Sequence, residues 1–414
     1  MKHIIKTALA IGLVSSSNLV AKSTIGGIVF TNMYISNIEN TSQENASTKR
    51  LEHDLTKFNM IVPSNSRFRV KWDNEDNANM YLEVGFGSKS KLKLRHGYGK
   101  WDINEQWQIL AGQTSTPFAP LNPQVSMVHN SGDGFGNANP SRQSQLRFTY
   151  KFLNRQGALA IAILDPNSGE TYEDGQFESE DKLQNEGAIP RIDIGGVYKK
   201  FDIDLFAGGF YSKASFEDYY NDVDVWGGSL GLRTAISNFT FSTEIATGIN
   251  WGNTKMSEIE IITNYSPDNA KGYVSNSRTA AVYNGSSQSL IDNEVTKAWV
   301  DIGYRFAGST FAGEFHLLAG YDKTEANENS VSQSYTNTML GVSMPIDIPY
   351  IARGFRLRPE FFYFNEEQED NQRGYATRKE IMGGIQAQFT FRSIIKISFA
   401  KESVIKMSSI DTMI

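Results

Sequence analysis

Basic side chains recur at even spacings in four short segments of this sequence. Residues two or four positions apart on a β-strand share a face, because successive strand side chains point to opposite sides. A row of such cations attracts anions, and arginine adds a planar fork that matches phosphate or carboxylate. The candidate cations are Arg67, Arg69 and Lys71; Lys91, Lys93 and Arg95; Arg147 and Lys151; and Arg356 and Arg358.

The positions between these cations are apolar. Phe68 and Val70 alternate with the first arginines, and Leu92 and Leu94 alternate with the next lysines. A soluble sheet would bury such a face under a second layer. A membrane barrel would turn it toward lipid and line an aqueous lumen with the charges.

The composition restricts the fold classes. The chain has 414 residues, 35 glycines and no cysteine. Its mean hydropathy is −0.38, and no segment approaches the roughly 18 consecutive apolar residues of a spanning helix. This argues against a helical membrane protein but suits barrel strands, which are only half apolar. Without disulfides, stability must come from hydrogen bonding and packing, which a closed barrel supplies.

The first 21 residues have the pattern of a secretory signal peptide. Lys2, His3 and Lys6 precede a short apolar segment, and polar residues lead to Ala21. We therefore predict cleavage near Ala21 and export of the chain. Loss of the two lysines would change the formal charge from −6 to −8. The alternative is a buried first helix or strand.

Alternating segments follow one another along the remainder of the chain, and the segment 51–65 is ambiguous, with the spacing of one helical turn. The longer polar breaks follow the odd-numbered strands, and short turns mostly follow the even-numbered ones, as in barrels with short periplasmic turns and long external loops. We predict an all-β, transmembrane antiparallel β-barrel of about 16 strands (16–18) over residues 22–391. A soluble periplasmic β-protein is the alternative. The expected strands are 24–38, 66–73, 79–87, 91–101, 106–113, 143–153, 157–165, 189–199, 201–213, 222–235, 237–250, 294–306, 310–322, 333–345, 352–365 and 378–391.

The last residues, 392–414, do not fit this rhythm cleanly. They contain the apolar stretch IIKISFAKES, which could form a seventeenth strand or the true last strand. Residues 392–414 are therefore predicted to be a C-terminal strand or an extension.

Three motifs resemble the N-terminal half of Gram-negative trimeric porins. They are SRFRVKW at 66–72, LRHGY at 94–98 and LAGQTSTPFAPLNP at 110–123. The nearest branch looks like the phosphate-selective and dicarboxylate-type porins, and the likeness covers about the first third of the mature chain. The resemblance implies a 16-stranded barrel, a homotrimer, and a third loop (114–142) folded into the lumen as a constriction.

The expected lumen charges are uneven. The carboxylates are scattered over the wall, and the third loop carries a single one, Asp133, among glycines. Dense arginine and lysine rows would favour anions despite the negative net charge. The alternative is that these cations pair with lumen carboxylates and stabilise the wall.

Signals for an enzyme or a cofactor are weak. His129 lies near Ser126, Ser131 and Asp133, but no nucleophile motif supports a catalytic triad. His96 falls in the register that faces lipid. The spacings of zinc, calcium and dinucleotide sites are missing, and so is an outward basic stripe for nucleic acid. We therefore predict no catalytic residue, metal, cofactor or nucleic-acid partner.

The sequence as a whole predicts an outer-membrane porin in contact with lipid. It would let small hydrophilic solutes, preferentially anions, diffuse passively. One alternative is a substrate-specific channel for phosphate or dicarboxylates. Another is an outer-membrane enzyme or adhesin that does not transport.

Overall fold

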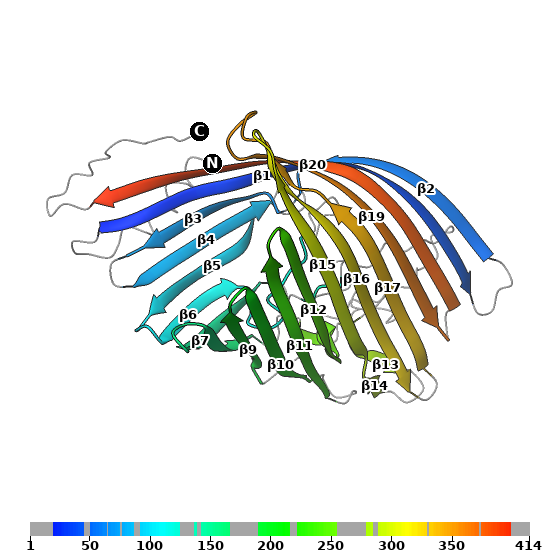
Figure 1. The fold of residues 1–414 in the computed structure, drawn as a ribbon. Coiled ribbons are helices and arrows are strands. Elements are labelled where there is room, and N and C mark those ends of the chain that lie inside the picture. Colours follow the sequence, from blue (N-terminus) through cyan, green and yellow to red (C-terminus); the bar gives the residue numbers. More distant parts are fainter. Residues whose placement is uncertain are drawn as a thin grey trace.

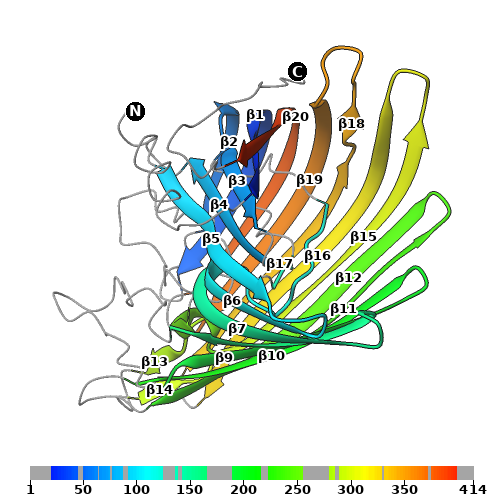
Figure 2. The ribbon, with the colours of Figure 1, turned by 90° about the vertical axis from the view of Figure 1, so that its left-hand side faces the viewer.

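A computed structural model of the chain shows a β-barrel (Figures 1 and 2). No helix in the part of the chain that it describes is long and apolar enough to cross a membrane. The structure describes residues 20–44, 50–63, 65–74, 77–86, 92–124, 136–138, 142–165, 189–215, 222–254, 279–284, 289–328, 331–371 and 374–398.

The described residues are mostly in strands, and one 3₁₀ turn, η3, covers Trp251–Thr254. The strands are β1 Val20–Glu44, β2 Arg50–Ile61, β3 Arg67–Asp73, β4 Ala78–Phe86, β5 Leu92–Asp102, β6 Trp107–Thr114, β7 Gln143–Phe152, β8 Gly157–Leu164, β9 Arg191–Lys200, β10 Ile203–Ala214, β11 Val223–Ile236, β12 Phe239–Ile249, β13 Val282–Asn284, β14 Ser289–Ile291, β15 Glu294–Ala307, β16 Ala312–Glu328, β17 Val331–Ser343, β18 Ile346–Asp347, β19 Phe355–Asp370 and β20 Gly374–Ser398.

Antiparallel pairing closes the sheet into a barrel. β20 pairs with β1 from Val20↔Ser398 to Glu44↔Gly374, and the two strands lie side by side in Figure 1. β2 and β3 pair with successive parts of β1, so they form one interrupted barrel strand. β17 and β18 share one position between β16 and β19 in the same way. The 18-stranded sheet is therefore a closed barrel of 16 strands, which confirms the predicted fold class.

The predicted strand rhythm is correct in most places. The segment 51–65, read as a loop with a helical turn, instead contains β2. Its leucines have helical spacing, but twelve residues of β2 pair with β1, and this pairing overrides the local pattern. β20 runs through Phe391 to Ser398, so the start of the predicted tail belongs to the last strand.

The outer face of the barrel is apolar. Large hydrophobic side chains on alternate strand positions are exposed there, as a lipid-facing surface requires. Aromatic residues meet across strands near the short turns, with ring centroids 4.8 Å apart for Trp107–Tyr150 and 5.0 Å apart for Phe239–Tyr304. The exposed apolar residues include Val29, Met33, Ile35, Phe68, Leu159, Ile161, Ile163, Ile192, Ile194, Leu317, Phe361, Ile381 and Ile385.

The described parts of the third loop (114–142) lie inside the barrel. Phe118 is fully buried, and its ring centroid lies 4.9 Å from that of Phe210 on β10 and 5.8 Å from that of Trp251. Ala281 and Leu290, which follow β12 in the chain, belong to the same apolar cluster. The described parts of two long connections therefore pack against the inner face of β10–β15.

Candidate functional site

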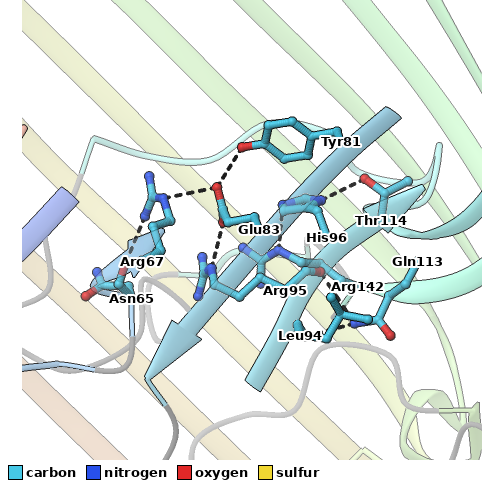
Figure 3. A network of polar contacts seen from close by, with 10 residues as sticks. All are labelled: Asn65, Arg67, Tyr81, Glu83, Leu94, Arg95, His96, Gln113, Thr114 and Arg142. Carbon is cyan, nitrogen blue, oxygen red and sulfur yellow. Dashed lines mark hydrogen bonds and ion pairs between the residues drawn. The ribbon is translucent and has the colours of Figure 1, made fainter. Parts of the chain in front are cut away.

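A basic wall forms the inner face of β3–β7. Arg67 on β3 and Arg95 on β5 lie on either side of one carboxylate, Glu83 on β4, with N–O distances of 3.3 and 2.8 Å. The Tyr81 hydroxyl donates a hydrogen bond to the same carboxylate at 2.8 Å (Figure 3). The Glu83 carboxylate thus forms ion pairs with two arginines, so the group of Arg67, Glu83 and Arg95 has a net positive charge.

A β-bulge in β5 brings two adjacent side chains to this wall. Val84 pairs with Leu94, whereas Glu83 pairs with His96, so Arg95 is the extra residue. An extra residue shifts the alternation of all that follow. His96 therefore faces the lumen, and its prediction as lipid-facing is wrong.

The other predicted cations of this wall also take inward positions. Lys151 pairs with Asp102 at 2.7 Å, and Lys71 pairs with Asp73 at 2.9 Å. Arg147 donates to the Ser115 carbonyl at 3.4 Å. Arg69 and Lys93 also lie on the inner face, opposite Glu83 and Gly85 in the register. The predicted Lys91 and Asp133 lie outside the described residues.

Arg356 and Arg358 form a separate group on β19, which β20 and β1 separate from β3. Arg356 makes a bidentate pair with Asp347, with both N–O distances 2.7 Å. The Arg358 side chain is buried, with an exposed fraction of 9%. The structure therefore does not bring these two arginines into the basic wall.

The opposite wall, β12–β16, carries carboxylates that the third loop covers. The Leu121 N–H donates to Glu244 at 3.2 Å, and the Gln124 N–H donates to Asp301 at 2.7 Å. Next to them Lys297 Nζ lies 3.3 Å from Asp322 Oδ1, and both side chains are buried. These carboxylates thus bind the loop or an adjacent lysine and are withdrawn from solvent.

His316 lies beside Asp301, one of the carboxylates that bind the third loop. Its Nδ1 lies 2.8 Å from Asp301 and its Nε2 lies 3.1 Å from Glu314, which also pairs with Arg305 at 2.8 Å. Despite these neighbours, no group of three His, Cys, Asp or Glu in the described ranges could hold a metal ion. Sequence reasoning missed this histidine because only the pairing of β15 with β16 places it beside Asp301.

The charges on the basic wall do not cancel. Among the described residues, eight cations face inward on β3–β7 against three carboxylates. The cations are Arg67, Arg69, Lys71, Lys93, Arg95, Lys100, Arg147 and Lys151, and the carboxylates are Asp73, Glu83 and Asp102.

Gly136 fixes the third loop against β15 and β16. A Cβ at this position would lie 1.9 Å from the Ala298 carbonyl oxygen, and φ is +66°. Gly136→Ala is therefore expected to lift the loop from the wall and to raise the rate at which a protease cleaves the loop on the order of tenfold. Limited proteolysis of the refolded barrel measures this. Gly99→Ala is the matched control, because its Cβ meets nothing within 4 Å; equal rates for the two variants would contradict the prediction.

These features define a transmembrane β-barrel of 16 strands with a loop in its lumen. Comparison with protein-family models and with curated proteins finds no match to the chain. Among solved structures, the outer membrane channel DcaP of Acinetobacter baumannii matches with a TM-score of 0.62 and 15% identity, over 90% of this chain and 98% of that one. The anion-selective porin from Comamonas acidovorans matches with a TM-score of 0.52 and 12% identity, over 89% and 100%. OmpT of Vibrio cholerae matches with a TM-score of 0.51 and 13% identity, over 91% and 99%. At these identities the likeness is one of fold.

Proposed function

We propose that this protein is an outer-membrane porin through which small hydrophilic solutes diffuse passively, with a preference for anions. The uncompensated basic wall on β3–β7 is the observation that carries the proposal. Cations along an aqueous path raise the local concentration of anions, and low-dielectric walls strengthen the effect.

The covered carboxylates of the opposite wall support the same proposal. The exposed fractions of Glu244, Asp301 and Asp322 are 2%, 3% and 0%. A carboxylate held by loop N–H groups or by a lysine attracts passing cations weakly. The wall on β3–β7 therefore has an excess of cations over carboxylates, whereas these three carboxylates of the opposite wall are buried and bound by the loop or by a lysine.

Planar-bilayer recording of the purified protein in a potassium chloride gradient tests this proposal. We expect discrete conductance steps, and a reversal potential whose sign reports higher permeability for chloride than for potassium. A reversal potential of the opposite sign would refute the anion preference. Absence of any conductance would refute the porin function itself.

A substrate-specific channel is the second candidate. It is favoured by Arg69 and Arg147, which form no ion pair with a carboxylate among the described residues and whose guanidinium forks suit phosphate or dicarboxylates. Titration of the channel with phosphate or succinate separates the two candidates. Saturable block of the chloride current would favour the specific channel, whereas a current that only follows ion mobility would favour the general porin.

We also propose export through the signal peptide of residues 1–21 and assembly as a homotrimer. Residues 1–19 lie outside the described part of the chain, whereas Val20 and Ala21 are the first two residues of β1 and pair with β20, so cleavage after Ala21 would shorten β1 by two residues. For the trimer, support comes from β2, which pairs with β1 along one edge and with no described strand along the other (Figure 1). Phe58 and Met60 beside that edge are exposed by 67% and 63%. An unpaired edge with apolar side chains invites a second chain, and native mass spectrometry would show the assembly.

A further inference from the structure

His96 connects the two stems of the third loop (Figure 3). Its Nδ1 lies 2.8 Å from the hydroxyl oxygen of Thr114, the last residue of β6. Its Nε2 lies 2.8 Å from Nε of Arg142, the residue that directly precedes β7. One side chain thus bonds the residue where the loop leaves the barrel wall and the residue where it returns.

The chemistry of Arg142 determines the protonation of the ring. A guanidinium group only donates hydrogen bonds, so Nε2 of His96 must accept and carry no proton. The remaining ring proton is then on Nδ1, which donates to the Thr114 hydroxyl. The arrangement therefore requires a neutral imidazole in one tautomer.

We propose that neutral His96 helps to position the two stems of the third loop, and that its protonation breaks the hydrogen bond to Arg142. A proton on Nε2 would replace the acceptor with a second donor, 2.8 Å from a guanidinium group. The bond to Arg142 would be lost and two cations would repel each other. The returning stem would then be held by fewer contacts.

The other charged and titratable groups around His96 are those of the basic wall. Glu83 and Tyr81 face it from β4, Arg67 from β3, and Arg95 precedes it in β5. Glu83 already serves Arg67 and Arg95, so it is not free to replace the bond that Arg142 loses. Thr114 can accept from Nδ1 in either protonation state. Acid therefore breaks the hydrogen bond between His96 and Arg142 and leaves the one between His96 and Thr114 intact.

His316, at the far anchor of the loop, has the opposite chemistry. Both of its ring nitrogens face carboxylate oxygens, which is the environment of a doubly protonated imidazolium. Added acid leaves the charge of that histidine unchanged. Of the two histidines that hold the loop, only His96 is set to respond to acid.

Two measurements test this inference. Only the first, the single-channel recording, rests on the proposed porin function. Single-channel recording from about pH 8 to about pH 4 covers the imidazole range and the region below it. We expect acid to raise the frequency of brief closures of the wild-type channel on the order of tenfold. This is the size of effect expected when a charge-assisted hydrogen bond is lost. Histidine-selective ¹⁵N NMR of the detergent-solubilised barrel reads the His96 tautomer directly, whether or not the barrel conducts.

Three variants decide the outcome. His96→Asn can accept from Arg142 and donate to Thr114 but cannot titrate, so it should keep the neutral-pH behaviour and lose the His96-dependent acid response. Arg142→Gln should show frequent closures at every pH, and Arg142→Lys, which can still donate, should behave more like the wild type. An acid response identical in wild type and His96→Asn would overturn the proposal, as would an NMR signature of a protonated Nε2 at neutral pH. If no variant conducts, the porin function fails and the NMR result alone decides on His96.

Discussion

Replacing both Arg69 and Arg147 with glutamate is expected to abolish the anion preference of the channel. The change moves the local charge by four units on a wall whose described residues carry eight cations and three carboxylates. At about 7 Å in water one unit charge contributes roughly 0.6 kcal/mol to the energy of a passing ion, so four units amount to on the order of 2 kcal/mol before screening. The anion-to-cation permeability ratio should therefore fall about tenfold or more, as measured by the reversal potential.

Two controls accompany this variant. Arg69→Lys with Arg147→Lys keeps the charge and should preserve the ratio. Lys323→Glu with Lys379→Glu makes the same change in net charge at positions in the outward register of β16 and β20, and should also leave the ratio nearly unchanged. If the outward variant shifts the reversal potential as much as the inward one, the selectivity does not reside in the basic wall.

Replacing Lys297 with methionine is expected to lower the free energy of unfolding more than the other substitutions proposed for this barrel. Lys297 and Asp322 form a buried ion pair, and their side chains are 0% and 1% exposed. Removing the lysine would leave a buried carboxylate without its cation, which typically costs about 3–5 kcal/mol. Urea titration of the refolded barrel in detergent measures the free energy of unfolding.

The matched control is the replacement of Lys323, which directly follows Asp322 on β16. Lys323 pairs with Glu325 on the exposed side, so Lys323→Met should change the free energy of unfolding by less than about 1 kcal/mol. The double variant Lys297→Met with Asp322→Leu should recover much of the loss, because no charge stays buried. A single variant as stable as the wild type would mean that the pair is not buried as described.

The sequence could predict which side chains of the basic strands face inward, because the side on which a strand residue lies depends on local alternation alone. Arg67, Arg69 and Lys71 need only a regular strand to share a face, and β3 provides one. The order of long and short connections likewise required no knowledge of contacts, and it led to the correct strand number.

The sequence could not predict features that depend on pairing between distant segments. The bulge at Arg95 is visible only in the register between β4 and β5, and it decides the side on which His96 lies. The contact from Gln124 to Asp301 spans 177 residues, so no local pattern encodes it. β2 was missed for the same reason, because its pairing with β1 outweighs its helical spacing.

The pairing of β1 with β20 has a consequence for biogenesis. The side chain of Gln386 donates to that of Asn32 at 2.8 Å, at a sequence separation of 354 residues. Contacts of such sequence separation form late, because the entropy of closing the intervening loop must be overcome first. Until β20 arrives, β1 presents a free edge to any other strand. We therefore expect assembly to depend on a factor that shields this edge until the barrel closes.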